Sequence, residues 1–181
     1  MVSPLYTQYK NTVVPELKKK LGVTNVMQVP RITKITINVG YGKHLKQPAL
    51  IEQIGKTLTA ISGQKPVHTK TKKAIANFKT RVGMPIGAMV TIRGPRMYDF
   101  LYKLIHVVLP RVRDFRGIDP KGFDAQGNYS MGFKENIAFP EVTVESLDRI
   151  HGLQIVLSTT AKNKQEGLAL LKEMGFPFRD K

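Results

Sequence analysis

The residue types that most often catalyse reactions or bind metals are scattered in this sequence. Its four histidines fall in four different predicted elements: His44, His68, His106 and His151. None has a second histidine four residues away or a carboxylate pair at ligand spacing. The chain has no cysteine, which excludes thiol nucleophiles, disulfides and thiolate metal sites. We therefore expect neither a metal site nor a cofactor.

Two short motifs match catalytic signatures only in part. The segment GYGK at 40–43 lacks the G-x-x-x-x-G-K-[ST] spacing of a phosphate-binding loop and is better explained as a turn at a strand end. Ser130 lies in YSMGF rather than in a G-x-S-x-G elbow. The acidic residues between Glu135 and Asp148 are explained by a solvated surface of mixed charge. These motifs argue against catalysis.

Net charge is the feature that points to a function. The chain of 181 residues carries 29 Lys and Arg against 13 Asp and Glu, a net charge of +16. Residues 1–98 hold 17 basic and two acidic side chains, whereas residues 99–181 hold 12 and 11. A field of one sign attracts polyanions, so the first half indicates a surface that faces phosphates. A scattered charge without a partner remains an alternative.

A membrane surface is a further candidate for the basic half. It would require a basic amphipathic helix with exposed large apolar residues, and the basic residues here lie mainly in expected loops and strands. The chain also begins without the apolar run of a secretion signal, and no stretch of about 18 apolar residues is present. We expect a soluble cytoplasmic protein with no membrane partner.

Hydrophobic periodicity predicts helices interleaved with strands. Helices are expected over residues 4–21, kinked or divided at Pro15, and over 48–62, 95–110 and 164–174. Strands are expected over residues 31–40, 64–69, 86–93, 129–133, 135–139 and 153–159. The strands alternate apolar and polar residues, which is typical of a sheet covered on one side. The pattern predicts one α+β domain over 1–181, an antiparallel sheet with helices on one face and a polar face open to RNA.

The polar side of two predicted strands carries groups that can hydrogen-bond RNA phosphates, sugars and 2′-hydroxyls. These residues are Lys34, Thr36, Asn38, Thr91 and Arg93. The sequence has no zinc-finger or helix-turn-helix spacing, and the predicted open face lacks the aromatic pair of an RNA-recognition motif. Recognition of the shape and backbone of folded RNA is therefore favoured. A strand-end turn explains Asn38 equally well, and ordinary β-propensity explains Thr91.

A basic segment joins two of the predicted strands. We call residues 70–83 the basic loop; it contains no acidic residue, and its charged residues are Lys70, Lys72, Lys73, Lys79 and Arg81. Like charges repel, so these side chains are too dense for a closed core. We expect the basic loop to be mobile in the free protein.

Several long segments, in order, resemble one protein family. They are VMQVPRITKITINVGYG, AISGQKPVHTKTKKAIANFKTRVGMPIGAMVTIRG, LPRVRDFRG and FDAQGNYSMGFKENIAFPE. From about residue 9 to residue 178, the chain is similar to the bacterial form of ribosomal protein five of the large subunit, the 5S-rRNA-binding family. The resemblance implies a structural protein of the central protuberance, ribosome-bound in the cytoplasm.

The resemblance also implies partners and site residues. Asn38, Gln64 and Thr91 match family positions that contact the backbone of 5S rRNA, and Lys70 through Arg81 match the loop that faces the P-site tRNA. Other expected partners are 23S rRNA, further large-subunit proteins of the central protuberance, and a small-subunit head protein across an intersubunit bridge.

Residues 111–148 are expected to face protein in part, because the second half is nearly neutral and its acidic residues cluster between Glu135 and Asp148. Two other functions stay open. An RNA-modifying enzyme would need a cofactor loop or an acid–base cluster, and none is visible. A free-standing RNA chaperone or regulator is the third candidate, which sedimentation with the large subunit would separate from a ribosomal protein.

Overall fold

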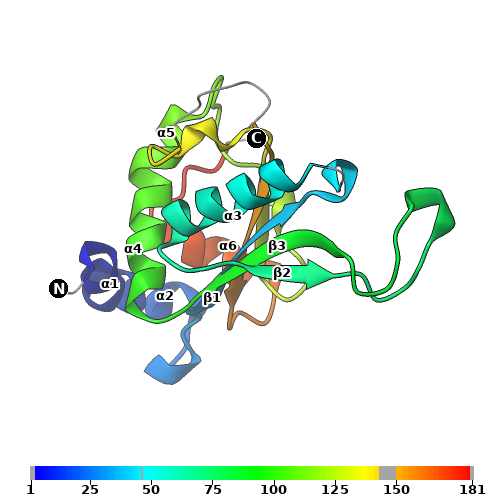
Figure 1. Cartoon of the computed structure of the whole chain (residues 1–181). Coiled ribbons are helices and arrows are strands. Elements are labelled where there is room, and N and C mark those ends of the chain that lie inside the picture. Colours follow the sequence, from blue (N-terminus) through cyan, green and yellow to red (C-terminus); the bar gives the residue numbers. More distant parts are fainter. Residues whose placement is uncertain (1–2, 46, 143–149, 180–181) are drawn as a thin grey trace. The chain divides into compact units, whose positions relative to one another are not determined.

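The computed structural model describes residues 3–45, 47–142 and 150–179 and has the α+β fold that the sequence predicts (Figure 1). Its open antiparallel sheet has the strand order β2-β3-β1-β5-β4. The strands are β1 (Ile32–Gly40), β2 (Val67–Lys70), β3 (Pro85–Ile92), β4 (Tyr129–Phe133) and β5 (Leu153–Thr159). The described part of the chain contains no helix long and apolar enough to cross a membrane.

The chain divides into two compact units. Unit 1 comprises residues 1–35, 92–131 and 155–181, and unit 2 comprises residues 36–91 and 132–154. The helices of unit 1 are α1 (Pro4–Gln8), η1 (Tyr9–Val13), α2 (Val14–Leu21), η2 (Val26–Gln28), α4 (Pro95–Lys103), η5 (Leu104–Val108), α5 (Leu109–Arg111), η6 (Pro120–Gly122) and α6 (Lys164–Glu173). Those of unit 2 are η3 (Gly42–His44), α3 (Pro48–Ser62), η4 (Ala76–Phe78) and η7 (Asn136–Ala138).

Two prolines lie inside long helical stretches of unit 1, and the helix widens before each of them. Proline has no N–H and its ring clashes with the carbonyl four residues earlier. The segments η1 and η5 are π-helical, so the N–H of Val14 donates to the carbonyl of Tyr9 and that of Leu109 to Leu104. Pro15 therefore interrupts the α-helical pattern of the first helix, which changes to a π turn and then continues to Leu21; in the same way the second helix passes Pro110 and ends at Arg111.

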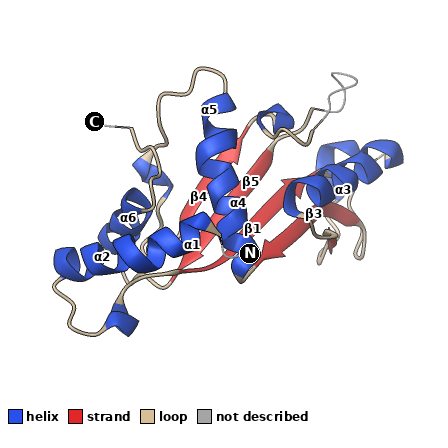
Figure 2. Cartoon of the chain, turned by 90° about the vertical axis from the view of Figure 1, so that its left-hand side faces the viewer, coloured by secondary structure: helices blue, strands red, loops and turns tan. Residues whose placement is uncertain are grey.

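The core of unit 2 lies between α3 and the strands (Figure 2). On α3, Ile54, Leu58 and Ile61 are buried. The helix begins at Pro48 and ends at Ser62, as predicted, because Gly63 takes a left-handed conformation with φ 67°. Both ends of α3 are therefore set by residues that restrict or permit particular backbone conformations.

The core of unit 1 is built around α4 and η5. All six apolar residues that the sequence places on the buried side of this helix are buried: Met97, Phe100, Leu101, Leu104, Ile105 and Val108. The last helix, α6, begins as predicted with Asn163, whose side chain accepts a hydrogen bond of 2.8 Å from the N–H of Glu166.

Two strand predictions need correction. The predicted strand 135–139 is replaced by the short 3-10 helix η7 (Asn136–Ala138): Asn136 is 1% exposed, and the N–H of Phe139 closes the turn onto the Asn136 carbonyl. The strand predicted from Gln64 begins only at Val67, since the chain first has to leave the left-handed turn at Gly63.

Candidate nucleic-acid interface

A row of neutral polar side chains lies on the open face of the sheet in unit 2. Thr36 and Asn38 come from β1 and Thr91 from β3, and all three are half-buried. They alternate with the fully buried Ile37 and Val90, whose side chains enter the core. The alternation therefore turns the predicted residues away from the core, as expected.

These side chains are available to a partner. Among the described residues, Thr36, Asn38 and Thr91 make no side-chain hydrogen bond. An amide and two hydroxyls, each both donor and acceptor, are thus held on strands whose backbone is fixed by the sheet. The face can hydrogen-bond phosphate, ribose or base-edge groups without moving its backbone.

Gly87 keeps part of this face flat. A Cβ atom at Gly87 would lie 2.8 Å from Oγ1 of Thr69 and 3.0 Å from the carbonyl oxygen of Val39. Thr69 on β2 is paired directly with Gly87 on β3, and the neighbouring pair is Val67 with Met89. Directly opposed residues of antiparallel strands share a face, so this surface combines apolar and neutral polar groups.

Gln64 lies in the link between α3 and β2, and local hydrogen bonds hold its backbone. Its N–H donates to Oγ of Ser62 (3.2 Å), and the same hydroxyl contacts the Gln64 carbonyl (3.1 Å). The side chain itself has no hydrogen-bond partner among the described residues. The turn that displaced the predicted strand start thus positions Gln64.

The structure groups four of the six predicted rRNA-binding residues in one unit. Thr36, Asn38, Gln64 and Thr91 belong to unit 2. The basic pair Lys34 and Arg93 belongs to unit 1, where Lys34 is half-buried on β1. Arg93 was predicted to end a strand, but β3 stops at Ile92 and Arg93 lies exposed immediately after it.

The longer segment of unit 2 carries almost no negative charge, whereas its segment 132–154 includes the exposed Glu135 and Glu141. Within residues 36–91 the sequence has one acidic residue, Glu52. Its carboxylate lies 2.8 Å from Nζ of Lys56, one helical turn away on α3. The hydrogen bond and positive charge of Lys56 lower the pKa of Glu52, which therefore stays ionised and paired.

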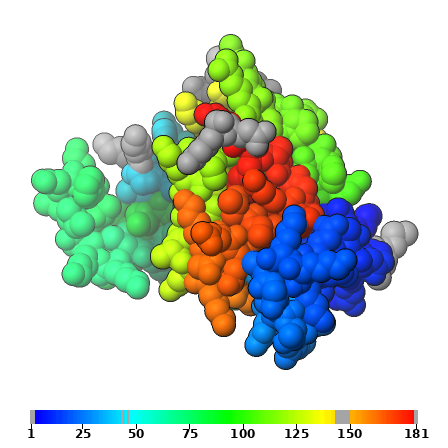
Figure 3. Space-filling model, turned by 180° about the vertical axis from the view of Figure 1, so that it is seen from behind, coloured from blue at the N-terminus to red at the C-terminus, as the bar shows by residue number. Residues whose placement is uncertain are grey.

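The basic loop is a hydrogen-bonded extension of the β2–β3 hairpin, and it forms a lobe at the left of Figure 3. Near its base, the N–H of Thr71 donates to the Met84 carbonyl (2.8 Å). Near its tip, Ile75 and Thr80 exchange two backbone hydrogen bonds of 3.3 Å around η4. All five predicted tRNA-contacting residues are exposed: Lys70, Lys72, Lys73, Lys79 and Arg81. Mobility of this loop in the free protein stays a prediction.

The same loop exposes apolar side chains that the sequence reasoning missed. Ile75 is 46% exposed, Phe78 71% and Val82 69%. Large apolar groups exposed among cations are unfavourable in water and indicate a contact surface. The available signal was local: Phe78 follows no helical or strand periodicity and lies one residue before Lys79.

No candidate metal centre is assembled in the described ranges. They contain no cluster of three or more His, Asp or Glu residues that could hold a metal ion. Three of the histidines make separate contacts: Nδ1 of His68 lies 2.8 Å from the Tyr41 hydroxyl, that of His44 3.3 Å from Oε1 of Gln47, and that of His151 3.2 Å from Nδ2 of Asn136. The strand-end turn predicted for 40–43 is confirmed, since β1 ends at Gly40 and η3 follows.

The structure describes only some of the acidic residues that the sequence clusters between Glu135 and Asp148. Glu135 immediately precedes η7 and Glu141 follows it by three residues, and both are exposed. Glu145 and Asp148, which complete the predicted cluster, lie outside the described residues. The predicted protein-facing role of 111–148 therefore stays a prediction.

Comparison with known proteins identifies the family. The family model described as "Ribosomal protein L5" matches residues 25–81, and that of the "ribosomal L5P family C-terminus" matches residues 85–178. The chain is 53% identical over 178 residues to the large ribosomal subunit protein uL5 of Desulfotalea psychrophila, covering 98% of this chain and 99% of the relative. It is 52% identical over 179 residues to that of Microcystis aeruginosa, covering 99% of this chain and 100% of the relative. The chain therefore belongs to the ribosomal protein L5 family, whose members are structural components of the large ribosomal subunit rather than enzymes.

Proposed function

We propose that this protein binds 5S rRNA with the open sheet face of unit 2 and helps to attach it in the central protuberance. One observation carries the proposal: Thr36, Asn38 and Thr91 hold unused hydrogen-bonding groups on an uncovered sheet face. Gln64 adds an amide just after α3. Lys34 and Arg93, which belong to unit 1, stay separate expected contacts with rRNA.

The chemistry of the face favours a folded RNA. Neutral donors and acceptors on a flat surface suit ribose hydroxyls and phosphate oxygens, which lie along the shallow minor groove of A-form RNA. Lysines around the face supply attraction that does not depend on sequence. The same cations suit 23S rRNA, which we expect as a second RNA partner together with neighbouring large-subunit proteins.

The basic loop is proposed to contact the P-site tRNA. Its five exposed cations can neutralise phosphates, and the exposed ring of Phe78 can stack on an unpaired base. A backbone braced by the Ile75–Thr80 pair would present both groups together at the tip of the loop. Phe78 is thereby the residue of this loop that can distinguish an unstacked base from plain duplex.

The intersubunit contact is proposed to use part of residues 111–148. Glu135 and Glu141 are exposed carboxylates in this stretch, and acidic groups avoid RNA phosphate while they suit a basic protein. The expected partner is a protein of the small-subunit head. The protein would accordingly act at the ribosome, in the cytoplasm.

Binding to 5S rRNA can be tested directly. Band-shift titrations should give a markedly tighter complex with 5S rRNA than with an elongator tRNA at the same salt concentration. In sucrose gradients at low magnesium, the protein should travel quantitatively with the large subunit. Equal affinity for both RNAs would contradict the assignment of the open face to 5S rRNA.

A further inference from the structure

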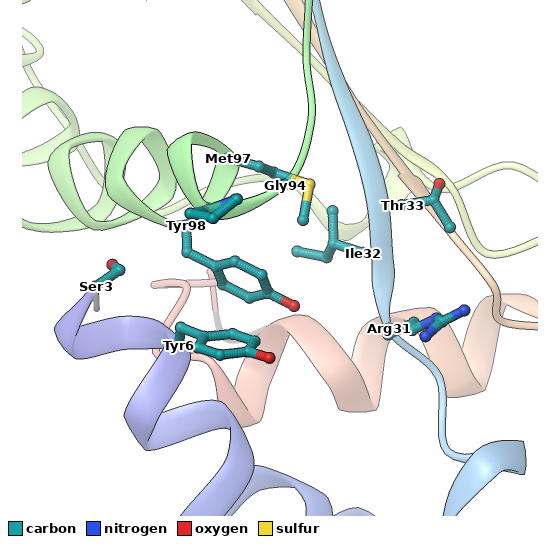
Figure 4. A pocket seen from close by; sticks show the side chains of 9 residues that line it. Ser3, Tyr6, Arg31, Ile32, Thr33, Gly94, Met97 and Tyr98 are labelled. Carbon is teal, nitrogen blue, oxygen red and sulfur yellow. The ribbon is translucent and has the colours of Figure 1, made fainter. Parts of the chain in front are cut away.

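Unit 1 contains a cavity of about 490 Å³ that none of the proposed contacts uses (Figure 4). It lies where α1, the start of β1 and the start of α4 meet, all within unit 1. The residues that line it are Ser3, Tyr6, Arg31, Ile32, Thr33, Gly94, Pro95, Met97 and Tyr98. Its volume lies in the range of roughly 300–1,000 Å³ that is typical of sites for small organic groups.

The wall of this cavity is mainly apolar and contains two aromatic rings. Ile32 and Met97 are each 3% exposed and Tyr98 is 8% exposed. The cavity is therefore lined in part by side chains of the hydrophobic core. The Tyr6 and Tyr98 rings pack against each other, with centroids 4.9 Å apart and planes tilted by 57°. A flat, largely apolar ligand would match this wall better than a hydrated ion would.

A few polar groups border the apolar wall. Figure 4 shows the hydroxyls of Tyr6 and Tyr98 pointing the same way, toward the side on which Arg31 lies. Neither hydroxyl has a hydrogen-bond partner among the described residues. Burial raises the pKa of Tyr98 to about 12, so its hydroxyl keeps its proton and can donate. Buried Oγ of Ser3 also lacks a partner within the described chain.

The charges around the cavity are positive and favour a ligand that carries a phosphate. The side chain of Arg31 is exposed and forms no ion pair with a described residue, and Arg93 and Arg96 flank Gly94 and Pro95. Residues 1–98 contain only two acidic residues. We propose that the cavity takes one nucleobase turned out of an RNA stack, with its edge on the tyrosine hydroxyls and the adjoining phosphate on Arg31.

The test uses three fluorescent RNA hairpins and the full-length protein. One hairpin carries a single unpaired adenosine, the second carries an abasic nucleotide at that position, and the third is fully paired. Fluorescence anisotropy should show binding at least ten-fold tighter for the unpaired adenosine than for either other hairpin. Equal affinity for the adenosine and abasic hairpins would overturn the proposal, because the base would then contribute nothing.

Variants of the cavity residues test whether the preference for the unpaired adenosine arises in the cavity. Tyr6→Phe and Arg31→Met should each reduce it several-fold, and both should fold, since neither removed group is bonded to a described residue. Lys19→Ala removes an equal charge from the exposed side of α2 and should weaken all three hairpins alike. A preference that survives the Tyr6→Phe/Arg31→Met double variant would place the base elsewhere.

Two further measurements separate this site from the 5S-binding face. Asn38→Ala should leave the adenosine preference unchanged, whatever it does to 5S rRNA binding. A 4-thiouridine at the unpaired position should photo-cross-link to the tryptic peptide 97–103, which contains Met97 and Tyr98. Cross-links confined to peptides of unit 2 would refute the cavity as the site.

Discussion

Alanine at Thr91 or Asn38 should weaken 5S rRNA binding equally at every salt concentration. Both side chains are neutral, so they release no counterions and cannot affect the salt slope. Each deletion leaves an RNA group without its hydrogen-bond partner, which costs about 1–3 kcal/mol, or roughly 5- to 150-fold in affinity. Lys34→Ala should instead flatten the log–log slope by up to about 0.9.

The assay is fluorescence anisotropy with labelled 5S rRNA at five salt concentrations, with a thermal melt of each variant. Folding should change little, within about 0.5 kcal/mol, because neither side chain is bonded to another described residue. Thr59→Ala is the control for loss of a threonine outside the sheet: Thr59 is exposed on α3 of the same unit, and its hydroxyl donates only to the Gly55 carbonyl within that helix (2.8 Å). A large drop in melting temperature for Thr91→Ala with unchanged RNA affinity would refute the reasoning and leave Thr91 a structural residue.

Four other changes test separate parts of the protein. Replacing Lys72 and Lys73 together with alanine should lower P-site tRNA retention by assembled ribosomes and leave 5S rRNA binding nearly intact; the reverse result would mean that the two surfaces are wrongly assigned. Phe78→Ala should weaken tRNA retention by about 1–3 kcal/mol with an unchanged salt slope, because it removes stacking and no charge. A cysteine at Glu141 should cross-link to a small-subunit head protein, whereas products containing only rRNA would contradict the bridge. Asn163→Ala should cost about 1 kcal/mol of unfolding free energy, measured by thermal melting, with RNA affinity as the control.

Most elements could be predicted because their periodicity and their end signals agree. The strand Leu153–Thr159 was predicted to the residue, since Leu153, Ile155 and Leu157 recur at every second position and are buried. The helix Pro48–Ser62 begins at a proline and ends before a glycine that takes the left-handed conformation. In such segments, local preference and tertiary packing select the same structure.

Two errors have different physical causes, a tertiary contact in one case and a change of helix type in the other. Residues 135–139 alternate weakly, yet Nδ2 of Asn136 lies 3.2 Å from Nδ1 of His151, and this contact across the chain accompanies a 3-10 turn. Pro110 was expected to stop its helix, but the π-helical turn before it removes the clash that would have done so.

The open face was accessible to sequence reasoning, whereas two other surfaces were not. Asn38 and Thr91 alternate with core residues, so their direction follows from strand geometry. Phe78 is a typical core residue by type, and its place outside any periodic segment, next to Lys79, was the one local signal against burial. The cavity beside Tyr98 joins segments that are more than 60 residues apart, a proximity that no local pattern encodes.

The π-helical turn η1 also constrains how this chain can change in length. Buried residues recur at every fourth position through the first helix: Leu5, Tyr9, Val13 and Leu17. In a regular α-helix four residues advance by about 40° beyond a full turn, so three such steps would carry Leu17 about 120° away from Leu5. The wider π turn holds more residues and offsets this drift. Deleting one residue from Tyr9–Val13 would let the π turn close into a regular α turn with Leu5 and Leu17 still on the same side, but it would restore the clash at Pro15. Homologous chains with one residue fewer in this stretch should therefore also lack the proline.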